Sequence, residues 1–230
     1  MYSFLRNKKI LVVVAHPDDE LLGLGASMNK LINEFNIITH VVILGEGITS
    51  RSDFHDTKRW EKELLIHKSN INKARIAIGY HTLNTHNFPD NRFDSVPLLE
   101  IVKVIEKEKE DFRPDVVFTH HGGDLNIDHR RTFEAVMTAC RPMSNENVKS
   151  IITFETPSGT EWRANTDPYH FLPNFFIGFN ENNLKAKTFD GLKLPLSVAA
   201  TNLITGRAEY FNQGSIIDKV LASSSIPVVF

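Results

Sequence analysis

Residues 9–15 read Lys-Ile-Leu-Val-Val-Val-Ala, an apolar and largely β-branched run with no polar interruption after the lysine. A strand that has one face in water alternates polar and apolar residues, whereas a strand covered on both faces reads as a continuous apolar run. Strands of the second kind are typical of parallel sheets that helices cover on both sides. The run therefore predicts a central strand of an α/β fold.

The segments that follow alternate between helical and strand patterns. Apolar residues recur at helical spacing over residues 21–35. Alternating strands and helices imply right-handed crossovers and a mostly parallel β-sheet with helices on both faces. We expect further strands at residues 37–44, 115–119 and 151–155, a loop that contains residues 87–91, and helices at residues 59–78, 96–109 and 128–140.

No linker, repeat or low-complexity tract divides the sequence. We therefore expect a single domain over residues 1–230, with a core at about 9–157 and a divergent C-terminal part at 158–230. Parallel sheets of this kind bind their ligands in the loops at the carboxyl ends of the strands. Polar residues that directly follow the expected strands are thus the candidates for a functional site.

Composition limits the classes of function. The chain is 41% hydrophobic and 23% charged, which excludes a disordered chain, and its net charge of −2 gives no field that would recruit nucleic acid. We find no secretory signal and no window with the ~18 apolar residues of a membrane span. Cys140 is the single cysteine, so no disulfide can form within the chain. We therefore expect a cytoplasmic protein without an integral membrane segment.

The first polar cluster lies where the first strand ends, at residues 15–20, which read Ala-His-Pro-Asp-Asp-Glu. Proline followed by three acids is also a good start for a helix, and that structural interpretation is about as probable when the cluster is taken alone. It does not explain His16 at the mouth of a buried strand. An imidazole and a carboxylate within one turn suit a metal ion, and a second carboxylate can stay free as a base.

The second polar cluster follows the strand expected at residues 115–119 and holds three histidines and two aspartates within residues 120–129. A lone histidine in the first turn of a helix is more often a packing or capping residue than a ligand. Parallel topology, however, brings both clusters to the same edge of the sheet. Two such clusters at one edge indicate a site rather than a coincidence.

Residues 15–20, together with the Asn-Ile-Asp-His-Arg sequence at residues 126–130, resemble the motifs of the LmbE-like, PIG-L-type family of zinc-dependent de-N-acetylases. The resemblance covers about residues 9–157. It implies a Rossmann-like fold and the removal of an acetyl group from an amino sugar or related N-acyl glycoside. It also implies a homo-oligomer, as a trimer or hexamer, and a small-molecule N-acetylated sugar, which could be a sugar nucleotide, as the substrate.

The resemblance also assigns roles to individual residues. His16, Asp19 and His129 match the zinc ligands and leave one coordination position open, as a catalytic zinc ion requires. Asp18 matches the general base, and Arg51 matches an arginine that contacts the substrate. A guanidinium suits a phosphate or an oxyanion, although Arg51 could also be an ordinary solvated loop residue.

One position departs from the family pattern. Many relatives carry a histidine where this chain has Asn126, and that histidine stabilises the oxyanion or protonates the leaving amine. Asn126 can offer only amide N–H groups, to the oxyanion or to a sugar hydroxyl. We expect His121 to be the replacement catalytic group, with a turn-forming role as the equally weighted alternative. Asp124 is the second candidate and is expected, with Asn126, on the substrate side of the pocket.

Two other classes of function compete with the deacetylase. Receiver-type signalling modules also hold a metal ion with acids after the first strand, but no phosphoacceptor aspartate is evident after residue 78 and the chain is about twice their length. A nucleotide-binding module is suggested by Gly23 and Gly25, yet no third glycine follows at the required spacing. Zinc in the purified protein would favour the deacetylase over both.

Overall fold

The computed structural model describes residues 2–156, 159–160, 162–178, 198–201, 208–211 and 213. The chain divides into two compact units, Met1–Gly178 and Phe179–Phe230. Among its described residues the second unit contains a two-stranded antiparallel ribbon of β6 (Val198–Thr201) and β7 (Ala208–Phe211). The expectation of one domain over the whole chain stays a prediction. All predicted site residues belong to the first unit.

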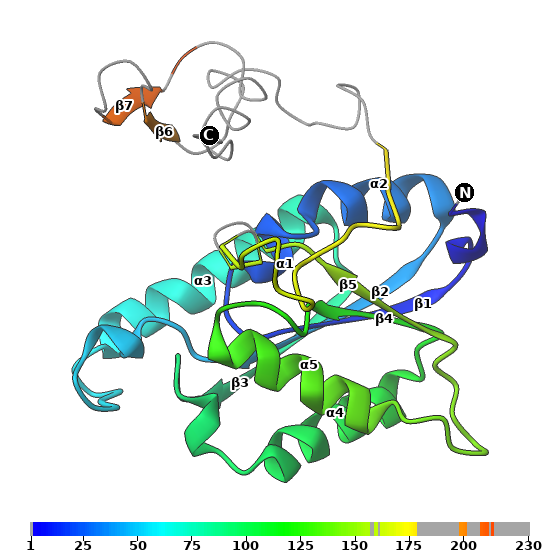
Figure 1. Ribbon diagram of the computed structural model, residues 1–230, viewed down its shortest axis with the longest axis horizontal. Coiled ribbons are helices and arrows are strands. Elements are labelled where there is room, and N and C mark those ends of the chain that lie inside the picture. The colour runs from blue at the N-terminus through cyan, green and yellow to red at the C-terminus, as the bar shows by residue number, and fades with distance from the viewer. Residues whose placement is uncertain are drawn as a thin grey trace. The chain divides into compact units, whose positions relative to one another are not determined.

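The first unit is built on a five-stranded parallel sheet with the strand order β3-β2-β1-β4-β5 (Figure 1). This arrangement confirms the predicted α/β, Rossmann-like fold with a mostly parallel sheet. The chain order reverses between β1 and β4, and ligands of such sheets bind at the carboxyl ends of the strands near that point. The strands are β1 (Lys9–Val14), β2 (Ile38–Gly45), β3 (Thr82–Phe88), β4 (Val116–His120) and β5 (Ser150–Phe154).

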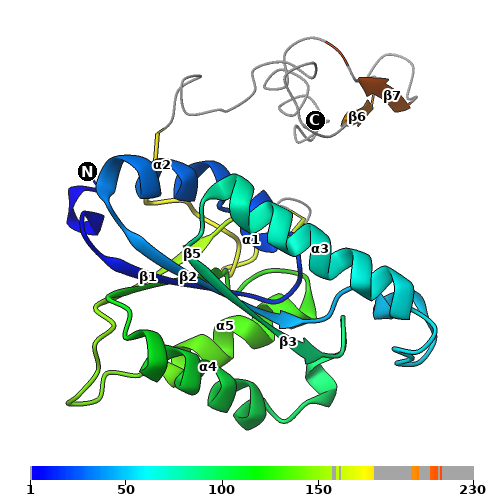
Figure 2. The same ribbon diagram turned by 180° about the vertical axis from the view of Figure 1, so that it is seen from behind.

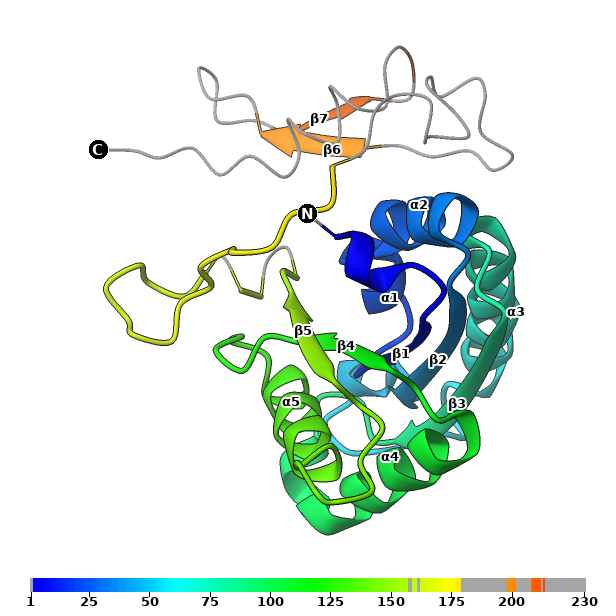
Figure 3. The same cartoon turned by 90° about the vertical axis from the view of Figure 1, so that its right-hand side faces the viewer.

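Helices cover both faces of the sheet, as Figures 2 and 3 show. Side chains of β1 alternate between the two layers: Ile10 and Val12 pack with α2 and α3, whereas Leu11 and Val13 pack with α4 and α5. No described helix is long and apolar enough to cross a membrane. The helices are α1 (Asp19–Leu22), α2 (Gly25–Phe35), α3 (Glu61–Ile78), α4 (Leu98–Phe112) and α5 (Ile127–Ala139), and the 3-10 turns are η1 (Ser3–Leu5), η2 (Thr49–Arg51) and η3 (Phe93–Ser95).

The structure differs from the sequence prediction at two elements that border the site. β3 extends through Phe88 where we expected a loop from residue 87. The helix expected at residues 21–35 is two helices, α1 and α2, separated at Gly23. A Cβ atom at Gly23 would lie 2.5 Å from the ring of Phe154, so the close packing of β5 against this junction requires glycine.

Candidate metal centre

Loops that follow β1, β2, β3 and β4 contribute side chains to one cluster at the carboxyl edge of the sheet. His16 follows β1, and Asp128 and His129 lie in the first turn of α5, just after β4. Asp90 follows β3, and Ser50 of the loop after β2 donates hydrogen bonds to Asp90 Oδ2 from both its Oγ, at 2.7 Å, and its backbone N. The structure thus confirms that the two polar clusters of the sequence share one sheet edge.

The three residues predicted as zinc ligands lie together. Ligand atoms of His16, Asp19 and His129 all lie within 4.8 Å of one another. His16 Nδ1 is 3.5 Å from Asp19 Oδ2, and His129 Nε2 is 3.4 Å from Asp19 Oδ1. Zinc bonds of about 2.0–2.1 Å at the tetrahedral angle separate neighbouring donors by roughly 3.3 Å, so this donor set fits a zinc ion. Two imidazoles and one carboxylate are donors typical of zinc, whereas magnesium prefers sites made of oxygen ligands alone.

A buried carboxylate lies behind each of the two predicted histidine ligands. Asp128 Oδ2 is 2.9 Å from His16 Nε2, and Asp124 Oδ2 is 2.9 Å from His129 Nδ1. Both aspartates are 0% exposed. A carboxylate on the second ring nitrogen fixes the tautomer and the orientation of a metal-binding histidine. We expected Asp124 on the substrate side of the pocket, but its burial and its contact with His129 suit a positioning residue instead.

The charges of the cluster are strongly coupled. Burial opposes the charged form of His16, but hydrogen bonds to Asp128 and Asp19 outweigh it and raise the pKa of His16 to about 10. For His129 burial is likewise outweighed, here by hydrogen bonds to Asp124 and Asp19, and the pKa rises to about 9. The pKa of Asp19 falls well below its ordinary value because His120, His129 and His16 overcome the effect of burial. A metal ion that binds these imidazoles must therefore displace protons at neutral pH.

His120 belongs to the second polar cluster of the sequence, but no role was predicted for it. It ends β4, is 0% exposed, and stacks on His129 with 3.8 Å between the ring centroids. Its Nε2 accepts a hydrogen bond from the backbone N of Ala15 at 3.0 Å, and its Nδ1 lies 3.3 Å from Thr156 Oγ1. Burial lowers the pKa of His120, so this imidazole is neutral. The hydrogen bond from Ala15 to His120 links the end of β1 to the end of β4, next to the ring of His129.

Asp18, the predicted base, has an unusual backbone conformation. Its φ of 101° lies in the left-handed region, which costs a non-glycine residue roughly 1–3 kcal/mol. The backbone N of Asp18 donates to Glu20 Oε2 at 3.1 Å, and the Glu20 side chain is buried. Loss of hydration next to the cluster, and then the neighbouring Asp19 carboxylate, raise the pKa of Asp18 to about 6, although the residue as a whole is exposed. A strained, weakly acidic aspartate next to a predicted metal ligand is suited to proton transfer.

Asn126 is the N-cap of α5. Its Oδ1 accepts hydrogen bonds from the backbone N of Asp128 at 2.8 Å and of His129 at 3.4 Å. Its Nδ2 donates to Asn91 Oδ1 at 3.0 Å. The expected contact of Asn126 Nδ2 with the substrate would have to replace its hydrogen bond to Asn91. Asn126 therefore has a structural role, because its N-cap positions Asp128 and His129, the two residues of α5 in the candidate metal centre.

We expect Asn126→Ala to lower the free energy of unfolding by about 1 kcal/mol, because an N-cap side chain typically contributes that amount. Asn126→Ser keeps an oxygen for the helix N-terminus and should return most of the loss, although it cannot bond Asn91. Urea unfolding of the three proteins measures the difference. Equal stability of the alanine variant and the parent would show that the cap contributes nothing.

Two further predicted residues lie outside this cluster of contacts. His121 Nε2 donates to the backbone O of Tyr169 at 2.9 Å, and its ring packs edge-on against Phe171. Among the described residues His121 belongs to no group that could hold a metal ion, and a proton-donating role would require that hydrogen bond to break. Arg51 ends η2 and is exposed, one residue after the Ser50 that holds Asp90.

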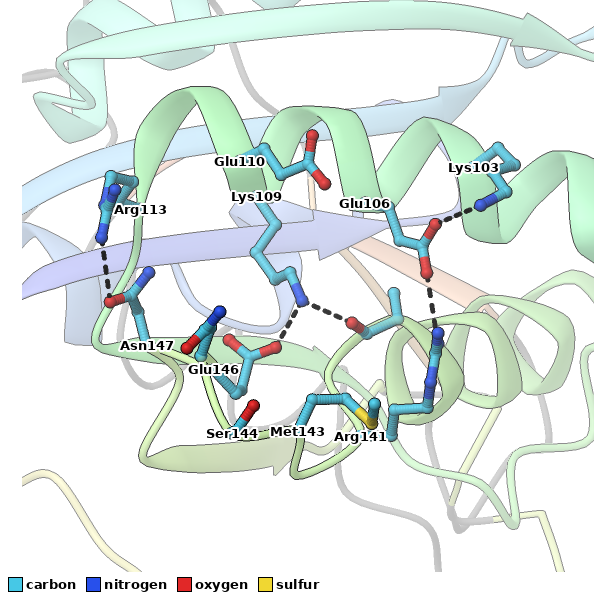
Figure 4. Close-up of a pocket in the computed structure, with 12 residues that line it drawn as sticks. Lys103, Glu106, Lys109, Glu110, Arg113, Arg141, Met143, Ser144, Glu146 and Asn147 are labelled. Atoms are coloured by element: carbon cyan, nitrogen blue, oxygen red, sulfur yellow. Dashed lines mark hydrogen bonds and ion pairs between the residues drawn. The ribbon is translucent and has the colours of Figure 1, made fainter.

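A cavity of about 900 Å³ lies away from this centre, between α4 and the segment that follows α5 (Figure 4). Its charged side chains neutralise one another: Glu106 pairs with both Lys103 and Arg141, and Lys109 pairs with Glu146. Both bordering segments lead into the amino ends of strands, so the cavity is at the opposite edge of the sheet. It offers no metal-binding group and does not contribute to the candidate site.

Comparisons with known proteins identify the family of this chain. The model of a family described as PIG-L, GlcNAc-PI de-N-acetylase, matches residues 11–140. A protein of Escherichia coli (strain K12) named uncharacterized deacetylase YaiS is 30% identical over 189 residues, which are 79% of this chain and 88% of the relative. The family match includes the residues of the candidate metal centre that follow β1 and β4.

Solved structures share the fold at lower sequence identity. The conserved protein TT1542 from Thermus thermophilus superposes with a TM-score of 0.50 at 20% identity, over 64% of this chain and 66% of that one. The zinc-inhibited form of teicoplanin deacetylase Orf2 gives 0.51 at 16% identity, over 64% and 67%. At this identity the likeness shows the fold alone. The family match and the sequence relative together show that this chain belongs to the PIG-L, or GlcNAc-PI de-N-acetylase, family of deacetylases.

Proposed function

We propose that this chain is a zinc-dependent hydrolase that removes the acetyl group from an N-acetylated amino sugar or sugar conjugate. The observation that carries the proposal is the set of His16, Asp19 and His129 donors, spaced for a zinc ion, with Asp18 beside them as a free carboxylate. Membership of a deacetylase family supports the reaction class. The sugar is suggested by that family's description.

Hydrolysis of an amide needs an activated water, stabilisation of an oxyanion, and a proton for the leaving amine. A zinc ion supplies Lewis acidity, which lowers the pKa of water to about 7 and polarises the carbonyl group. Asp18 takes a proton from the water molecule as the water oxygen attacks the carbonyl carbon. When the C–N bond breaks, Asp18 returns the proton to nitrogen, and the products are acetate and the free amine.

Asp18 is assigned both proton transfers because the structure leaves no imidazole where relatives carry a histidine. Asn126 cannot transfer a proton, and His121 is bonded to a backbone carbonyl. The raised pKa of Asp18, about 6, makes it a stronger base than an ordinary aspartate and still leaves it ionised at pH 7. Arg51 is proposed as a contact for an anionic part of the substrate, and Asn126 for a sugar hydroxyl.

Acetate release tests the proposal. The zinc-loaded protein is incubated with N-acetylglucosamine, a nucleotide-linked form of it and a lipid-linked form, and acetate and free amine are measured together. We expect equimolar acetate and amine from at least one substrate, and loss of that activity after chelation with recovery on adding zinc. Absence of acetate from the whole panel, with zinc bound, would reject an N-acetyl sugar as the substrate.

We expect the activity to fall as the pH decreases through a value no higher than about 6. Asp18 must be ionised to accept a proton, its pKa in the metal-free protein is about 6, and a nearby dication lowers it further. The pH dependence of kcat/KM reports this group in the free enzyme. A midpoint well above 6 would point to another group, and Glu20 is the first candidate because burial raises its pKa to about 7 in the metal-free protein. Glu20→Gln, which keeps an acceptor for Asp18 N, is the control.

Two finer assignments follow from the family resemblance and from composition. We propose that the protein acts in the cytoplasm and assembles as a trimer or hexamer. The exposed apolar side chains Leu65, Ile66 and Ile76 of α3 are compatible with an interface between copies. Light scattering of the purified protein measures the mass in solution, and a mass of about 26 kDa would reject the oligomer.

A further inference from the structure

His16 contacts carboxylates through both of its ring nitrogens. Nδ1 lies 3.5 Å from Asp19, on the side of the proposed zinc ion. Nε2 lies 2.9 Å from Asp128 Oδ2 and 3.4 Å from Asp90 Oδ1. Donor atoms of His16, Asp90 and Asp128 all lie within 4.8 Å of one another. These separations again fit donors around one ion with bonds of about 2.0–2.2 Å.

Another trio, His120, Asp124 and His129, is equally compact but less suited to an ion. His120 Nε2 accepts from the backbone N of Ala15, and its Nδ1 faces Thr156. An ion on His120 Nε2 would leave the buried backbone N–H of Ala15 without its acceptor, and His120 itself is 0% exposed. At the Asp90 side, by contrast, the side chain of His16 is 12% exposed and that of Asp90 is 6% exposed.

The cluster holds more negative charge than one zinc ion can neutralise. Among the described residues, the carboxylates of Asp18, Asp19, Asp90, Asp124 and Asp128 lie near three imidazoles, those of His16, His120 and His129. One zinc ion bound to His16 and His129 takes the place of the protons of these two histidines. Asp90 illustrates the excess: besides His16, its described hydrogen-bond partners are Ser50 and Asn91, which are neutral donors. Asp90 and Asp128 thus share a single imidazole, and buried carboxylates that outnumber their cationic partners favour the binding of another cation.

We propose that His16 Nε2, Asp90 Oδ1 and Asp128 Oδ2 form a second divalent-metal position beside the first. The proposal takes the first position, on His16 Nδ1, Asp19 and His129, from the proposed function. The imidazole of His16 then bridges the two ions, and its Nε2 proton passes to solvent. Nitrogen and carboxylate donors select zinc over magnesium at this position as well.

Occupation of the second position has a consequence for the first. Asp128 orients His16 through a hydrogen bond to His16 Nε2. An ion bound at His16 Nε2 replaces this hydrogen bond and withdraws electron density from the imidazole. His16 becomes a weaker ligand for the first ion. The second ion therefore acts as an inhibitor, and zinc in excess of one equivalent lowers turnover.

Zinc bound per chain tests the proposal without any substrate. The full chain is dialysed against stepped concentrations of free zinc, and bound metal is measured by mass spectrometry. We expect two equivalents in the parent, one tight and one weaker. Asp90→Asn removes one carboxylate donor and should weaken the second equivalent at least tenfold while keeping the first. Asp19→Asn should instead lose the tight one, and Asp94→Asn, at an exposed position of the same loop, should bind two.

A parent that saturates at one equivalent, or an Asp90→Asn variant that keeps the second with unchanged affinity, would overturn the proposal. Thermal unfolding verifies that Asp90→Asn is folded, and Asp90→Ser serves as a second variant that keeps a small polar side chain. Two equivalents in a parent that releases no acetate would reject the proposed function and still support the second position. Inhibition by excess zinc that Asp90→Asn relieves would support both.

Discussion

The Asp18→Asn variant should bind zinc like the parent and lose turnover by at least ~10²–10⁴-fold, which is the usual contribution of a general base. Asparagine has almost the same shape as aspartate, and after glycine it is among the residues that best tolerate a positive φ. The φ of 101° at position 18 is therefore kept, as is the hydrogen bond from its backbone N to Glu20. Only the proton-accepting carboxylate is removed.

Measurement of kcat and of bound zinc on the same sample separates base from ligand. Asp19→Asn is the matched control, because it makes the same chemical change one residue away and removes a predicted zinc donor instead. Loss of zinc from Asp18→Asn with retention in Asp19→Asn would mean that the two roles are exchanged. Near-normal kcat in Asp18→Asn would show that another group moves the proton.

The sheet could be predicted from the sequence because its central strands are covered on both faces. The runs at residues 10–15 and 116–118 are continuously apolar, and β1 and β4 are buried along almost their whole length. β3 was harder to predict because it is an edge strand. Its sequence, Thr-Leu-Asn-Thr-His-Asn-Phe, is largely polar and its side chains are mostly exposed or half-buried. Asp90, which follows β3, was therefore not placed next to His16.

The bringing together of His16, Asp19 and His129 was predictable because each follows a central strand at a parallel edge. The identity of their neighbours was not. A sequence does not show on which side of an imidazole ring a carboxylate will lie. Asp124 was therefore predicted to contact the substrate, although its carboxylate lies behind His129. His120 was overlooked for a related reason: a histidine that ends a buried strand can point into the core as readily as toward the site.

The sequence around Asn126 is compatible with two different roles for this residue. Its position in the motif suggested an oxyanion contact, because relatives use a histidine there. Its residue type, just before a helix, also fits an N-cap, and the structure shows that cap. The signal was present in the sequence as an asparagine two residues before the helix expected at 128–140. The substrate role of its Nδ2 stays a prediction, since that atom now bonds Asn91.

The His129→Ala variant should lose most of its bound zinc and, with it, the deacetylase activity. One of three protein donors is removed, and alanine offers no replacement. The structure adds a second effect: Asp124 is 0% exposed and loses the imidazole that satisfies its Oδ2. A buried charge left without its partner costs roughly 3–5 kcal/mol, so the metal-free variant should also be less stable than the metal-free parent.

A second substitution separates these two effects. Adding Asp124→Asn to His129→Ala replaces the stranded carboxylate with a neutral amide of the same shape. It should return part of the free energy of unfolding, measured in urea with chelator present, without returning zinc. In an otherwise unchanged chain, Asp124→Asn should keep zinc with an affinity roughly 10–100-fold lower, as is typical when the carboxylate behind a histidine ligand is removed. Unchanged zinc affinity in that single variant would mean that Asp124 stabilises the fold and does not position His129.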